Sequence, residues 1–73
     1  MILFPGRPIL YRFPLPEPEG AFKVMGALAM STSAEDLTLL LLDPDGMGVL
    51  HHIPFSEEPL QNTWTWAPVD PAP

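Results

Sequence analysis

Cysteine is absent from this 73-residue sequence and cations are scarce, and each shortage excludes a class of protein. Without cysteine there are no disulfide bonds and no thiolate metal ligands, which fits a reducing, cytoplasmic compartment. Lys and Arg number 3 against 9 Asp and Glu, for a formal net charge of −6 at pH 7. So few cations cannot neutralise a row of phosphates or anionic headgroups, so neither a nucleic acid nor a membrane is an expected partner.

Long apolar runs are missing as well. The leucine run at residues 39–42 is far too short to cross a bilayer. Residues 1–8 place their apolar side chains before the first cation, the reverse of a signal peptide. Neither a leader nor a membrane anchor is therefore expected.

The size and composition predict one small β domain that depends on a partner. A chain this short buries only roughly 60% of its unfolded surface, and without disulfides a partner chain is the expected source of extra stability. Hydrophobic residues make up 47%, which argues against disorder. Proline occurs 11 times and disfavours long helices, which leaves short strands, turns and extended arms.

Alternating apolar residues and turn signals predict an all-β fold, a small antiparallel β-sandwich or partly open barrel of about 5 short strands. The turn Asp43-Pro44-Asp45-Gly46 joins the third strand to the fourth as a hairpin. The predicted strands cover residues 9–13, 21–30, 37–42, 49–55 and 63–66. The whole chain is one domain, with an N-terminal arm at 1–8, a core at 9–66 and a Pro-rich tail at 67–73; residues 14–20 form a stiff connector.

Two of these strands compete with helices. Residues 21–30 contain good helix formers, but Gly26 interrupts them and there is little polar face, so a strand is favoured. Ser33 and Asp36 resemble a capping box before a helix at 34–42, yet that run has no 3.6 period. A strand buried on both faces is favoured there.

The faces of two strands follow from alternation. One face of residues 21–30 carries Phe22, Val24, Leu28 and Met30, and the other, smaller face carries Lys23, Met25, Ala27 and Ala29. Residues 49–55 place Val49, His51, Ile53 and Phe55 on one face, and Leu50 and His52 on the other.

The sequence offers no pattern for a metal site or a catalytic centre. In Asp43-Pro44-Asp45-Gly46 the glycine comes two positions too early for a calcium-binding EF-hand loop. Adjacent strand residues point to opposite faces, so His51 and His52 are not expected to bind one ion, although a pH-sensitive contact stays open. The serines lack a nucleophile setting, and the pair Glu57 and Glu58 falls in a loop. Neither enzymatic activity nor a cofactor is expected.

The stretch from Leu37 to Trp66 resembles the small immunoglobulin-like β-sandwich domains of tailed-phage virion and accessory proteins. Those domains carry a strand ending in D-P-D-G, then G-V-Y, then I-P, then G-T-W-x-Y or W. The matching residues here are Asp43-Pro44-Asp45-Gly46, Gly48-Val49-Leu50, Ile53-Pro54 and Thr63-Trp64-Thr65-Trp66, with Asn62 where Gly is usual. The resemblance implies a virion protein assembled in the host cytoplasm.

The expected function is that of a structural or assembly protein, a repeated subunit or homo-oligomer in a head, neck, tail or decoration. Aromatic residues are enriched in cores and at interaction hot spots. Trp64 and Trp66 are therefore candidates either for the domain's own core or for contact with a partner, since so small a domain has little chain to cover both. The alternative is an acidic soluble regulator or inhibitor of one host protein. The candidate partner-binding residues are Ile2, Leu3, Phe4, Trp64 and Trp66 for apolar contact, and Arg7, Arg12 and Lys23 for acidic neighbours.

Overall fold

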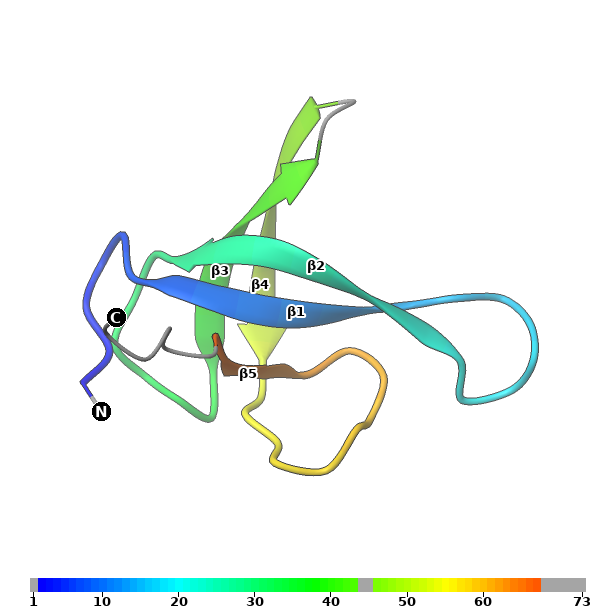
Figure 1. Ribbon diagram of the computed structural model, residues 1–73. Helices are drawn as coiled ribbons and strands as arrows, with labels where there is room; N and C mark the ends of the chain where they lie inside the picture. The colour runs from blue at the N-terminus through cyan, green and yellow to red at the C-terminus, as the bar shows by residue number, and fades with distance from the viewer. Residues whose placement is uncertain (1, 44–45, 68–73) are drawn as a thin grey trace, which may run out of the picture.

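The computed structural model describes residues 2–43 and 46–67 (Figure 1). Within these ranges the regular secondary structure consists of β-strands alone. The strands are β1 (Pro8–Pro14), β2 (Phe22–Ala29), β3 (Leu37–Asp43), β4 (Gly46–Ile53) and β5 (Trp64–Trp66). They form one 5-stranded antiparallel sheet of order β4-β3-β2-β1-β5. The predicted all-β class is therefore confirmed, and β2 and β3 are strands where a helix was the competing interpretation.

The sheet bends back on itself without closing. In Figure 1 the β1–β2 pair crosses the β3–β4 pair at a steep angle. The chain that follows β4 returns to β5, where Phe55 and Trp64 form an isolated parallel bridge. The Trp64 N–H donates to the Pro54 carbonyl (3.1 Å), and the Ser56 N–H donates to the Trp64 carbonyl (3.1 Å). The second sheet that a sandwich requires is not found in the described part of the chain.

The predicted connector is the turn between β1 and β2. Its Leu15 N–H donates to the Ala21 carbonyl and the Ala21 N–H donates to the Pro18 carbonyl, each at 2.9 Å. Gly20 has a φ of 83°, a conformation that glycine adopts without a Cβ clash. Local backbone hydrogen bonds therefore shape this turn. Of the predicted tail at 67–73, all but Ala67 lies outside the described residues.

The core lies on the inner face of the bent sheet. Alternate residues of the strands turn inward, as the two-residue period of a strand predicts. Three partly buried residues from outside the strands, Leu3, Ala34 and Phe55, pack against this core. The buried apolar residues are Ile9, Tyr11, Met25, Ala27, Ala29, Leu37, Leu39, Leu41, Ile53 and Trp64.

The smaller face of β2 is the buried one. Ala27 pairs with Ile9 of β1 on one side and with Leu41 of β3 on the other. A small residue between two large ones lets the facing side chains interdigitate. The larger face of β2, with Val24 exposed, consequently lies outside.

β3 is buried on one face only. Leu37, Leu39 and Leu41 point into the core, whereas Leu40 is half-buried and Leu42 is exposed. The expectation that this strand is buried on both faces is therefore wrong. No layer of the described chain packs over its outer leucines, which leaves apolar surface outside.

A β-bulge interrupts the pairing of β3 with β4. Leu37 pairs with Ile53 and Leu39 with Leu50, so Thr38 of β3 lies opposite two residues of β4. An extra residue in one strand reverses the alternation beyond it. Leu50 and Ile53, three positions apart, therefore both contribute to the core.

The two residues of the bulge are His51 and His52, and both are exposed. His52 has a φ of 59°, in the left-handed region. Alternation predicted His51 on one face with Ile53, and His52 on the other with Leu50. That assignment is wrong, because it assumes an uninterrupted strand.

Replacing His52 with Gly should stabilise the fold. The left-handed conformation costs an L-residue roughly 1–2 kcal/mol, whereas glycine adopts it at an entropic cost of roughly 0.5–1 kcal/mol. We expect the free energy of unfolding to rise by about 0.5–1 kcal/mol, measured by urea denaturation followed by tryptophan fluorescence. His51→Gly is the matched control and should lower it by about the same amount. A His52→Gly protein no more stable than His51→Gly would contradict the left-handed bulge.

Candidate functional site

The N-terminal segment packs back on its own sheet. The Gly6 N–H donates to the Ala29 carbonyl at 2.6 Å, and the Ala29 N–H donates to the Arg7 carbonyl at 2.8 Å. Leu3 packs against the core, whereas Ile2 is 75% exposed. The segment is therefore anchored at Gly6 and Arg7 and presents apolar surface near its start.

Arg7 joins this segment to β5. Its Nη1 donates to the Ile2 carbonyl at 3.1 Å. Its guanidinium carbon lies 5.7 Å from the ring centroid of Phe4 and 4.9 Å from that of Trp66. Cation–π contacts at these distances orient both rings. Ile2, Phe4, Arg7 and Trp66 together are named the arginine–aromatic cluster, and Ile2 and Phe4 are its exposed apolar members.

The two tryptophans of β5 have different surroundings. Trp64 is 0% exposed, and its indole N–H donates to the Ala34 carbonyl at 2.9 Å. Trp66 is half-buried and meets Trp64 edge to face, with ring centroids 4.9 Å apart. Phe55 packs on Trp64 with centroids also 4.9 Å apart. Trp64 thus belongs to the core, and Trp66 lies between the core and the surface.

The side chain of Arg12 is buried within the fold. It is 7% exposed, and its Nη1 lies 3.0 Å from the Ser56 carbonyl, 2.8 Å from the Glu58 carbonyl and 2.9 Å from the Thr63 hydroxyl. These contacts tie the loop before β5 to β1, so the Arg12 side chain is a structural anchor. Lys23, by contrast, is exposed on β2 and far along the chain from the arginine–aromatic cluster.

Five of the candidate residues therefore gather at one end of the sheet, namely Ile2, Leu3, Phe4, Arg7 and Trp66, with Trp64 beneath them. Arg12 and Lys23 lie elsewhere. The gathering could not be read from spacing, because residues 2–7 and 66 meet only when β1 pairs with β5.

A second apolar surface covers the outer side of the sheet and was missed from the sequence. Leu28 pairs with Leu40, and Leu40 pairs with Val49, so three strands contribute a row of outward side chains. Leu42 pairs with Met47 further along the hairpin. We name these five residues the outer apolar face. The sequence indicates this face only through the leucines at residues 39–42, because a strand that is apolar at every position has apolar side chains on both faces.

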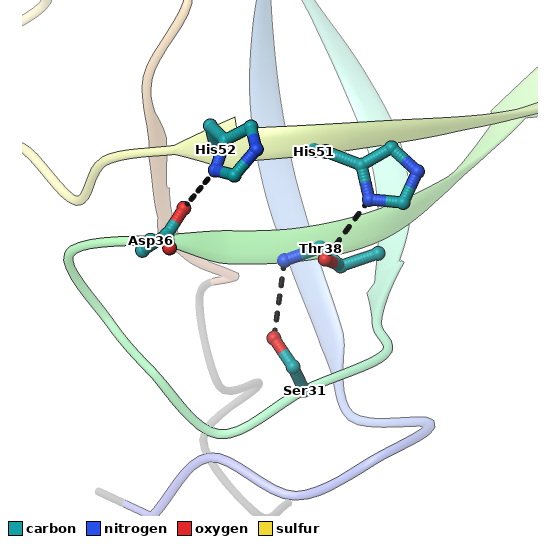
Figure 2. A network of polar contacts seen from close by, with 5 residues as sticks. All are labelled: Ser31, Asp36, Thr38, His51 and His52. Carbon is teal, nitrogen blue, oxygen red and sulfur yellow. Dashed lines mark hydrogen bonds and ion pairs between the residues drawn. The ribbon is translucent and has the colours of Figure 1, made fainter.

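Polar contacts surround the two histidines (Figure 2). His52 Nδ1 lies 2.6 Å from the Asp36 carboxylate, and His51 Nδ1 lies 3.3 Å from the Thr38 hydroxyl. The Thr38 N–H donates to the Ser31 hydroxyl at 3.1 Å. His52 and Asp36 are both exposed, so this ion pair contributes little to stability.

These groups form no metal centre in the described chain, where no three His, Cys, Asp or Glu side chains are placed to hold an ion. The same ranges contain no helix long and apolar enough to span a membrane. The described residues do expose apolar and aromatic side chains, which are suited to contact with another apolar surface.

Comparison with protein-family models, with curated proteins and with solved structures found no match for this chain. The interpretation of its function therefore depends on its own residues.

Arg12→Met should destabilise the fold. The change leaves the Ser56 and Glu58 carbonyls without their charged donor, and buried groups left unpaired cost roughly 1–3 kcal/mol. We expect the free energy of unfolding to fall by about 2–3 kcal/mol in urea denaturation. Lys23→Met removes an exposed cation and should change it by less than about 0.5 kcal/mol. Equal effects of the two changes would refute the anchoring role of Arg12.

Tyr11 should make stability depend on alkaline pH. Burial raises the pKa of its phenol above the ordinary 10.0, and the hydroxyl donates to Asn62 Oδ1 at 2.6 Å. The unfolded chain therefore loses the phenol proton first, so the free energy of unfolding falls as pH rises above about 10 and levels off above the folded-state pKa. The chain has 1 Tyr, so phenolate absorbance reports this group alone. Tyr11→Phe should be less stable near neutrality and lack the alkaline loss; an unchanged alkaline slope would refute the assignment.

Proposed function

We propose that this protein is a non-enzymatic structural or assembly protein that acts through protein–protein contacts, as a component of a phage virion. The observation that carries the proposal is the apolar N-terminal segment. Ile2 is 75% and Phe4 is 48% exposed, yet Arg7 and two backbone hydrogen bonds to Ala29 hold the segment in place. Ordered apolar side chains lose little conformational freedom on binding, which favours association.

The size of the chain supports the same proposal. A single open sheet has one face in its own core, and the outer apolar face has no covering layer in the described ranges. Exposed apolar patches rimmed by polar residues mark interaction surfaces in soluble proteins. A subunit repeated in a symmetric assembly would bury both surfaces against neighbours.

The proposal keeps the resemblance to phage immunoglobulin-like domains but replaces their two-sheet sandwich with a smaller fold. The fold that we propose is a partly open barrel, because the Phe55–Trp64 bridge brings the chain after β4 to the far edge strand. Asn62, in place of the usual Gly, has a φ of 56°, and its Oδ1 accepts a hydrogen bond from the Tyr11 hydroxyl. Asparagine, like glycine, tolerates this left-handed conformation.

The charge distribution favours a second candidate, an acidic regulator that binds a basic protein. Arg12 is buried, whereas the acidic side chains that are exposed, rather than half-buried, within residues 2–43 and 46–67 are Glu17, Glu19, Glu35, Asp36, Glu57 and Glu58. A stable monomer that titrates one-to-one with a basic partner would favour this candidate. Presence in purified particles would favour assembly.

The double change Ile2→Ser and Phe4→Ser should abolish assembly without unfolding the chain. Both side chains are largely exposed, so little core packing is lost, whereas hot-spot truncation typically costs 2 kcal/mol or more of binding. We expect the variant to be depleted at least about tenfold from purified particles, measured by quantitative mass spectrometry.

Leu60→Ser is the matched control, because Leu60 is 51% exposed in the loop before β5 and remote in sequence from the N-terminal segment. It should enter particles like the wild type. Normal incorporation of the double variant, with its fold verified by tryptophan fluorescence, would show that the N-terminal segment is not the assembly surface.

A further inference from the structure

β4 is an edge strand, and no strand of the described chain pairs with its free side. β4 comes first in the sheet order and pairs with β3 alone among the described strands. Antiparallel strands direct N–H and C=O groups alternately to both sides, so an edge strand presents unpaired groups to solvent. Beyond Ile53 the chain turns toward β5, which leaves residues 46–50 as the open part of the edge.

Residues 46–50 lack the devices that usually protect an edge. They contain no Lys, no Pro and no charged side chain. The bulge lies beyond them, at His51 and His52. A Cβ added at Gly46 or Gly48 would meet nothing within 4 Å. Glycine within a strand often marks the close approach of another backbone, and the space that a side chain would occupy at these two positions is free of the described chain.

The apolar side chains beside this edge also suit an added strand. Met47 and Val49 of β4 continue into Leu42 and Leu40 of β3 on the outer apolar face. A strand joined to β4 would widen that face and cover the exposed flanks of Met47 and Val49. Cross-strand pairs of this kind stabilise a sheet by roughly 0.2–1 kcal/mol each.

We propose that a second copy of this chain adds its own β4 antiparallel to β4, so that two sheets join into one across a two-fold axis. The proposal rests on the proposed function and names the partner and the surface. A two-fold axis pairs a strand with its own copy in the opposite direction, which is the self-complementary arrangement of an isologous interface.

The charge distribution limits where two copies can meet. A net charge of −6 opposes contact between two copies over most of their surface, but residues 46–50 are uncharged. Antiparallel pairing places the Gly46 end of one strand beside the His51 and His52 end of the other. β4 carries no acidic side chain from Gly46 to Ile53, so the two paired strands bring no carboxylates of their own together.

The available area indicates a weak dimer. Specific interfaces bury roughly 1,200 Å² or more in total, about 600 Å² per copy. That is about an eighth of the 4959 Å² surface of this chain. The exposed apolar side chains beside the edge are few, with Met47 at 75%, Val49 at 50% and Leu42 at 43%. We therefore expect a weak dimer, with a dissociation constant of about 10–100 μM.

Val49→Lys tests the edge, because a lysine on an edge strand opposes strand addition. Val24→Lys is the matched control: Val24 and Val49 are 55% and 50% exposed and both lie on the outer side of the sheet, but β2 is an interior strand. Sedimentation velocity from about 5 to 500 μM should show a dimer for the wild type and Val24→Lys. Val49→Lys should raise the dissociation constant at least about tenfold.

Hydrogen exchange of the wild type gives a second measurement that needs no variant. The amides of Met47 and Val49 should become more protected as the protein concentration rises through the dimer transition. Exchange there that does not change with concentration overturns the proposal, even if Val49→Lys fails to fold. A monomeric wild type, a fully dimeric Val49→Lys, or equal losses in both Lys variants also overturn it.

These outcomes are separable from those of the proposed function. Loss of particle incorporation in the Ile2→Ser, Phe4→Ser variant, together with an unaffected Val49→Lys dimer, would leave the assembly function standing and reject edge pairing. A dimer sensitive to Val49→Lys that never enters particles would support edge pairing and reject the virion function.

Discussion

Burial of Trp64 is the interaction on which the rest of this fold depends. Its strand pairs with β1, its backbone bonds Pro54 and Ser56 after β4, and its indole N–H bonds the Ala34 carbonyl before β3. One residue thus connects both ends of the sheet order. Removing roughly 150–250 Å² of aromatic surface from water corresponds to about 4–6 kcal/mol, a large share of the stability of so small a domain.

The same arrangement explains why so much apolar surface stays outside. Trp64 fills the inner face of a single bent sheet, and small residues such as Ala27 and Ala29 accommodate the large ones there. The chain has no second layer in its described ranges, so leucines and valines on the outer side remain uncovered. Both proposed interaction surfaces, the arginine–aromatic cluster and the β4 edge, follow from this shortage of covering chain.

Basic residues that look alike in the sequence have unlike roles in the fold. Arg7 and Arg12 are five positions apart and each flanks an apolar segment. Arg7 stacks on Phe4 and Trp66 near the surface, whereas Arg12 is buried under the loop before β5 and bonds its carbonyls. The difference arises from the β1–β5 register, which is a long-range property, and no local pattern around either residue encodes it.

The sequence by itself determined the all-β class, the five strands and their turns, because alternation, proline positions and the Asp-Pro-Asp-Gly turn act over a few residues. Only the tertiary structure decided which face of each strand is buried. The bulge at His51 and His52 reverses the alternation of β4, and pairing with two large neighbours selects the small face of β2. Register between distant strands therefore decides which apolar residues remain at the surface, and with them where this protein can bind.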